Sequence, residues 1–385
     1  MKTQKKSLIN IIGSILAALF IGALVLSFAR SCKKDEPYRE PSLPTTGTLN
    51  ARLASAVGDV ELSLPENMTL SVNDGGETVL GKAGANIVLD GENVGVINAI
   101  GGKHSVIRAG NAGSLTFKNF TINDCTDDSI SGYGNYLYFG GDVTFENCTI
   151  TDSIYFYKGN SATFKNCKFS STIANQYSVW IGDGTATFER CTFNGFRGLK
   201  VHEFKDLPQD VKSVDVDTCL FYSLTNKPGI AIGALDENSS VRVTGSTFDK
   251  CLSWDTVGSL TGVDGFYECD TPLTDFSFSE ESNTITNIRY KISYKWYSLE
   301  REIEDIPPLM FKSDANYPTS YVAGEETKID DLGIWKQSSR ESYEFEGWFF
   351  EPMCSEESAF DGVITADMTG DIVIYAKVAI WLGVW

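Results

Sequence analysis

A short pattern recurs through the middle of the chain and constrains its fold more than any other feature. An apolar or aromatic residue is followed by two polar residues, a small residue, one further residue and then Ile or Phe. The copies begin at Phe117, Phe145, Phe164, Phe188, Val216 and Val243. Successive copies lie 28, 19, 24, 28 and 27 residues apart. These offsets are too short for a propeller blade of about 40 residues and fit one turn of a solenoid.

Each copy predicts two short strands joined at a corner. The β-branched and aromatic content favours strands, so the repeat indicates a β-solenoid. The first apolar residue should point inward from one strand, and the small residue and the final Ile or Phe inward from the next. Asn119, Asn147 and Asn166 fall at the corner, where Asn tolerates left-handed backbone geometry and can bond its stacked neighbours.

This organisation resembles the right-handed parallel β-helix of the pectin-lyase-like superfamily, from about Val60 to Cys269. Two earlier segments, residues 87–91 and 106–110, look like less regular N-terminal coils. The resemblance implies an all-β chain with a parallel β-helix over residues 60–275. That superfamily contains both polysaccharide lyases and inert adhesins, so the fold alone does not assign a function.

The N-terminus is typical of an export signal. Three lysines precede residues 7–29, a run of 23 residues without a charge. The run is long for a cleaved signal peptide and long enough to remain in the membrane as an uncleaved anchor. Ala29 and Ser31 then precede Cys32, which resembles bacterial lipoproteins, where such a cysteine is diacylated and becomes the new N-terminus. Arg30 departs from that pattern.

We therefore expect Cys32 to be lipidated, with residues 1–31 as signal peptide or membrane anchor and residues 32–59 as a polar tether. An uncleaved anchor helix and plain secretion are the alternatives. All three place the folded part outside the cytoplasm, in the cell envelope, and the lipoprotein alternative places it at the outer surface.

A second domain is expected over residues 288–378. From residue 290 to residue 377 the chain resembles a single Listeria–Bacteroides repeat, the small β-grasp-like module of internalin-type surface proteins. Residues 343–349 match its aromatic-rich core strand and residues 369–377 its closing turn and strand, although Val378 stands where the family has Trp. The resemblance implies a spacer or contact module without catalytic activity.

The charge balance excludes a nucleic-acid partner. The chain has 32 basic and 51 acidic side chains. The four basic residues before Cys32 lie in a segment without acids, so the remainder has a formal charge of −23. Such a surface repels phosphates, whose binding needs clustered Lys and Arg.

The cysteines are expected to be structural. Of the nine, four occupy the small position of the repeat: Cys148, Cys167, Cys191 and Cys219. Phe120 and Ser246 hold the same position in other copies, which indicates an inward slot for a modest hydrophobic group. A stack of reduced thiols is the favoured interpretation, with disulfides between coils or a metal site as alternatives; no Cys-x-x-Cys pair is present.

Two segments are candidates for chemistry. Asp124, Asp127 and Asp128 follow the first clear coil and offer hard oxygen ligands for calcium, although a solvated loop is the favoured interpretation. Asp127 and Asp128 are adjacent, so in a strand they would face opposite sides. Residues 197–203 bring Arg197, Lys200, His202 and Glu203 close together in the sequence, and an ordinary surface loop is again the simpler interpretation.

Aromatic residues in the β-helix region are candidate binding contacts: Tyr155, Phe156, Tyr157 and Trp180. Some of them could instead belong to the core. No phosphate loop, nucleophile elbow or His-rich metal pattern occurs. We expect no cofactor, no resident metal and no catalytic residue.

The sequence therefore favours a non-enzymatic envelope protein that serves as an adhesive or interaction scaffold. Its partners would be the membrane, through the N-terminal lipid or anchor helix, and a host, matrix or polysaccharide ligand. The alternative is a surface polysaccharide lyase or hydrolase. That alternative requires carboxylates from neighbouring coils to converge with Arg or Lys in one groove.

Overall fold

The structure is a computed structural model. It describes residues 53–63, 77–98, 106–123, 137–151, 153–171, 176–203, 210–254, 261–297, 302–333, 335–338 and 341–382. Cys32 and the uncharged run at residues 7–29 lie outside these ranges. Among the residues described, no helix is both long and apolar enough to cross a membrane.

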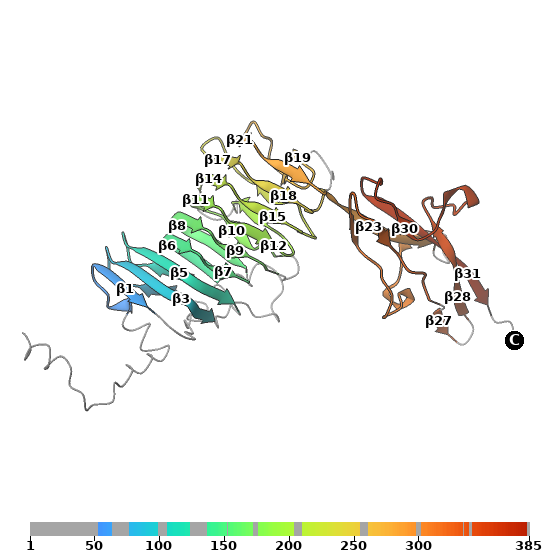
Figure 1. The fold of residues 1–385 in the computed structure, drawn as a ribbon, viewed down its shortest axis with the longest axis horizontal. Coiled ribbons are helices and arrows are strands. Elements are labelled where there is room, and N and C mark those ends of the chain that lie inside the picture. The colour runs from blue at the N-terminus through green and yellow to red at the C-terminus, as the bar shows by residue number, and fades with distance from the viewer. Residues whose placement is uncertain are drawn as a thin grey trace, which may run out of the picture. The chain divides into compact units, whose positions relative to one another are not determined.

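The described strands from β1 to β22 form a parallel β-helix (Figure 1), in which they stack in three columns. The first column contains β1 (Asp59–Ser63), β3 (Asn86–Asn98), β5 (Ser114–Asn123), β6 (Leu137–Glu146), β8 (Ile154–Lys165), β11 (Gly184–Glu189), β14 (Val211–Asp217), β17 (Ser240–Thr244) and β21 (Ser277–Glu281). The second contains β7 (Thr149–Ile150), β9 (Lys168–Phe169), β12 (Thr192–Asn194), β15 (Leu220–Tyr222), β18 (Thr247–Asp249) and β22 (Thr284–Thr286).

The third column contains β2 (Glu77–Leu80), β4 (Val106–Ala109), β10 (Val179–Ile181), β13 (Leu199–His202), β16 (Ile230–Gly233) and β20 (Tyr267–Cys269). The N-terminal halves of β6 and β8 join this column between β4 and β10. β19 (Thr261–Val263) pairs with β20 in the antiparallel direction.

The predicted inward positions form the core. Phe145, Phe164 and Phe188 occupy equivalent positions of the first column and are fully buried. Their rings stack with centroids 5.2 and 4.7 Å apart. In the second column Phe193 and Phe221 stack at 4.5 Å. Such ring pairs add about 0.5–1.5 kcal/mol each beyond the area that they bury. The strand register that the repeat predicts is confirmed.

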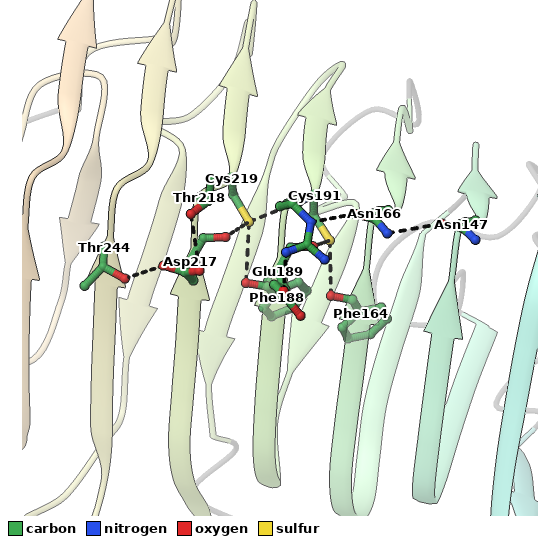
Figure 2. Close-up of polar contacts among 11 residues, drawn as sticks. Asn147, Phe164, Asn166, Phe188, Glu189, Cys191, Asp217, Thr218, Cys219 and Thr244 are labelled. Carbon is green, nitrogen blue, oxygen red and sulfur yellow. Dashed lines mark hydrogen bonds and ion pairs between the residues drawn. The ribbon is translucent and has the colours of Figure 1, made fainter.

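The Asn ladder at the corner is also confirmed. Asn119, Asn147 and Asn166 have φ angles of 58°, 55° and 52°, in the left-handed region. The side-chain amide of Asn147 donates to Asn119 Oδ1 at 3.2 Å. That of Asn166 donates to Asn147 Oδ1 at 3.2 Å, as Figure 2 shows. Arg190 extends the ladder through its Nε, 2.9 Å from Asn166 Oδ1. The left-handed turn also directs the Asn166 N–H to the Glu189 carbonyl of the next coil, at 2.9 Å.

The predicted cysteine slot faces the core. Cys148, Cys167, Cys191 and Cys219 are buried free thiols. Each thiol donates to a carbonyl of the preceding coil; Cys191 Sγ, for example, lies 3.4 Å from Phe164 O (Figure 2). Ser246 occupies the same slot, where its hydroxyl accepts the Cys219 N–H at 3.0 Å and donates to Thr244 O at 3.1 Å. In these five coils the slot holds a small side chain that makes a hydrogen bond to the nearby backbone.

The β-helix extends further than the sequence predicts. β21 and β22 pair in parallel with β17 and β18, so the predicted end at residue 275 is too early. This coil places Asn283 and Ile285 where the preceding one has Ser246 and Phe248, and the polar Asn conceals the pattern. Asn283 is satisfied at this position, because its Oδ1 accepts the Ser246 N–H and its Nδ2 donates to Val243 O, both at 3.0 Å.

The C-terminal strands form a separate sheet in the order β24-β23-β31-β28-β27, with β25 paired to β23 and β29 to β28. The elements are β23 (Arg289–Tyr297), β24 (Ile303–Asp305), η2 (Pro308–Met310), β25 (Ser320–Val322), β26 (Thr327–Lys328), β27 (Trp335–Ser338), β28 (Glu341–Phe349), η3 (Glu356–Ser358), β29 (Ala359–Phe360), β30 (Val363–Ile364) and β31 (Ile372–Leu382). β26 and β30 form a two-stranded sheet. The C-terminal strands enclose a hydrophobic core of their own, which includes Tyr343, Trp348 and Ile374. The last strand continues past the predicted boundary at residue 378, and the resemblance to a Listeria–Bacteroides repeat stays a prediction.

Candidate functional site

The outer face of the third column contains a hollow of about 210 Å³. Strand alternation turns Lys200 of β13, Ala231 of β16 and Glu268 of β20 outward, and these three residues lie in register. Because Ala231 has only a methyl side chain, β16 forms the floor between two taller walls. Gly233 lies opposite His202, and a Cβ at Gly233 would come within 1.9 Å of the Asp270 carboxylate. The small residues of β16 thus create the space.

The two walls of the hollow have opposite charge character. β13 contributes Lys200 and His202, whereas β20 and the residue after it contribute Glu268 and Asp270. His202 Nε2 lies 3.7 Å from Asp270 Oδ2. Glu268 is held from two sides: Lys227 Nζ lies 3.0 Å from Oε2, and the Tyr177 hydroxyl donates to Oε1 at 3.4 Å. Each carboxylate already has a basic partner and keeps lone pairs for a further hydrogen bond.

Lys200 differs from the other charged groups of the hollow. Its Nζ lies 3.9 Å from the ring centroid of Trp180 and 5.6 Å from that of Tyr177, distances typical of cation–π contacts. Among the described residues no carboxylate lies within ion-pair distance of it. Burial lowers the pKa of the Lys200 amine to about 8; the Asp270 carboxylate opposes this change and the Arg197 guanidinium adds to it.

The aromatic candidates lie on the same column but not on an open surface. Tyr155 and Trp180 are only 3% and 1% exposed, with ring centroids 4.7 Å apart, and the Lys200 amine lies over the Trp180 ring. Direct ligand contact by either residue stays a prediction. Phe156 points inward and belongs to the core. Tyr157 lies in β8, and its side chain is not among those described.

The sequence segment 197–203 is only partly assembled into the hollow. Lys200 and His202 line it, and Arg197 stacks over Tyr177 at 5.2 Å. Glu203 does not line it; its carboxylate accepts the Val211 N–H at 2.6 Å, and burial raises its pKa. The calcium candidates Asp124, Asp127 and Asp128 lie outside the described residues. No group of potential metal ligands occurs among the residues that the structure describes.

Glu268, Asp270, Lys227 and Tyr177 were missed by sequence reasoning. Glu268 follows Lys200 by 68 positions, and only the coil register brings β20 two strands away from β13. One sequence feature could have indicated the hollow: the small residues Ala231 and Gly233. The strand register places them between the charged side chains of β13 and β20.

One comparison with known proteins supports this architecture. A family model described as right handed beta helix region matches residues 105–292. The fold is therefore an all-β, right-handed parallel β-helix. No curated protein matches the chain, and no solved structure matches it.

Proposed function

We propose that this chain is a membrane-anchored protein of the cell envelope that binds a glycan in the hollow between β13 and β20. The observation that supports this most directly is that two carboxylates, each with a basic partner, and the Lys200 amine gather around a small-residue floor. Binding without turnover is the favoured form of the proposal.

The polar groups of the hollow suit sugar hydroxyls. Glu268 and Asp270 can accept hydrogen bonds, whereas Lys200 and Lys227 can donate them. Tyr177 is buried, and its hydroxyl fixes the position of the Glu268 carboxylate. The volume of about 210 Å³ is below the roughly 300 Å³ where drug-sized pockets begin. It therefore fits one sugar unit of a longer chain that continues along the outer face.

The anchoring part of the proposal rests on the N-terminal sequence. A basic segment, the uncharged run of residues 7–29, Cys32 and the polar tether follow in the order expected for export and lipidation. The strongly acidic remainder suits a soluble, exposed domain.

A second candidate function is cleavage of a polysaccharide. The observation that favours it is the Lys200 amine, which faces two carboxylates across the hollow and has a pKa lowered to about 8. An amine with a pKa near the working pH can act as a general base. Convergence of carboxylates with Lys is also the arrangement that a lyase or hydrolase requires.

One experiment separates the two functions. The chain from Cys32 onward is incubated with neutral, acidic and amino polysaccharides, with and without calcium, and both retention and new reducing or unsaturated ends are measured. Ala231→Phe should fill the hollow and abolish binding, whereas Thr187→Phe, on the exposed face of β11, should not. Binding unchanged by Ala231→Phe would reject the hollow as the site. New ends that disappear in Lys200→Met would support cleavage.

A further inference from the structure

We propose that Lys200 is a carbonyl-reactive amine that condenses with a small aldehyde in the hollow to form an imine. The chemical class includes the open-chain reducing end of a sugar. This inference concerns the reactivity of one side chain and holds whether or not the hollow binds a polymeric glycan.

The geometry leaves the amine available. Lys200 projects into the hollow from β13. Among the described residues its amine makes no side-chain hydrogen bond or ion pair, and it lies over the rings of Trp180 and Tyr177. The nearby carboxylates are engaged elsewhere, Glu268 by Lys227 at 3.0 Å and Asp270 by His202 at 3.7 Å. Exposed lysines of the same β-helix are different: Lys212, for example, is paired with Asp210.

The environment also provides the neutral form of the amine. Burial, with Arg197 close by, lowers the pKa of Lys200 to about 8. Desolvation and a neighbouring cation are the two means by which proteins activate a lysine nucleophile. At pH 7.5 about a quarter of an amine with this pKa is neutral, against roughly 0.1% of an ordinary lysine with a pKa near 10.4.

The reaction balances within the site. The lone pair of Nζ attacks the carbonyl carbon, the C=O π pair moves to oxygen, and a proton passes from nitrogen to that oxygen to give a carbinolamine. A second proton, delivered from the His202–Asp270 pair, lets the hydroxyl leave as water while the nitrogen lone pair forms the C=N bond. The nitrogen's remaining hydrogen returns to the pair to leave the neutral imine. Amine and aldehyde thus give imine and water, with no oxidant or reductant required. The Trp180 ring, 3.9 Å from Nζ, would stabilise the positively charged iminium by a cation–π contact.

The test traps the imine in the folded, full exported chain. Glycolaldehyde and cyanoborohydride are added between pH 6 and 9, and labelling at each lysine is followed by peptide mass spectrometry. We expect Lys200 to be labelled at least about tenfold faster than Lys212 at pH 7.5, given the difference in neutral fraction. Asp270→Asn should shift the pH at which Lys200 labelling is half-maximal to lower values, because it removes the carboxylate that opposes the lowered pKa. The same shift is not expected for Lys212.

Two outcomes would overturn the inference: labelling of Lys200 no faster than that of Lys212, or labelling of Lys200 only in urea. A Lys200→Arg variant shows whether the preferred label belongs to this residue and keeps the cation if the chain needs it to fold. The probe is a free aldehyde, so an absence of preferred labelling at Lys200 would not count against polysaccharide binding. The result of the Ala231→Phe binding experiment likewise does not bear on whether Lys200 of the unmodified chain reacts with an aldehyde.

Discussion

Substitutions at Asn166, at the corner of the β-helix, should lower the free energy of unfolding by amounts that follow from the structure. Asn166 has a φ of 52°, a left-handed conformation that costs a residue with a Cβ about 1–2 kcal/mol and that Asn and Gly tolerate better. Its side chain also bonds Asn147 and Arg190. Both bonds are exposed, so each should contribute about 0.5 kcal/mol, the lower end of the usual range.

Asn166→Ala should therefore lower the free energy of unfolding by about 2–3 kcal/mol, because it loses both bonds and introduces a side chain that is strained in the left-handed conformation, which Asn tolerates. Asn166→Gly should lower it by about 1 kcal/mol, because it loses the bonds but accepts the left-handed backbone. Asn194→Ala, at an exposed position of β12, serves as the control and should stay within about 0.5 kcal/mol of the unmodified chain.

The buried thiol next to the corner provides the assay. Cys167 is 1% exposed, so its pulse alkylation at increasing urea, followed by mass spectrometry, reports the opening of this coil without interference from the C-terminal sheet. The urea dependence should keep its slope in all three variants. Equal losses for Asn166→Ala and Asn166→Gly would show that the corner backbone is not strained, and would refute the argument.

Three further predictions follow from other parts of the molecule. Metabolic labelling with a fatty-acid analogue should mark the chain and be lost in Cys32→Ala; label retained in that variant would reject lipidation. Cys167→Val should cost only about 1–2 kcal/mol, whereas Cys167→Asp should prevent folding, because a lone buried carboxylate has no partner; a native-like Asp variant would show that the slot faces solvent. Binding of an acidic sugar should weaken as the pH rises through about 8, where Lys200 loses its charge, and Lys200→Met should remove that step from the titration.

The architecture of the β-helix was predictable because equivalent positions of successive coils require similar side chains. An inward Phe, a left-handed corner and a small buried slot recur with similar side chains, so six copies suffice to set the register. The last coil was not predicted because Asn283 stands in place of the small residue. Its amide is satisfied by hydrogen bonds to backbone groups of the preceding coil. A polar residue in an inward slot is invisible to a search for hydrophobic periodicity.

The candidate site was only half predictable, for a physical reason. Lys200 and His202 are two residues apart on one strand, so their common face follows from strand alternation. Glu268 lies near them only because the chain completes two coils of unequal length between β13 and β20, which places both strands in the same column. Those lengths depend on loops, which no repeating pattern specifies. Trp180 shows the opposite problem: its outward position was predictable, but its near-complete burial was not.

We propose that this protein binds its ligand in the hollow of β13, β16 and β20. Amide hydrogen exchange of the full exported chain, with and without the polysaccharide that it retains best, tests this directly. We expect slower exchange on binding in peptides that contain residues 199–202, 230–233 and 267–270, with no such protection in Ala231→Phe. Protection confined to the C-terminal sheet, or to the outer faces of β11 and β14, would contradict it.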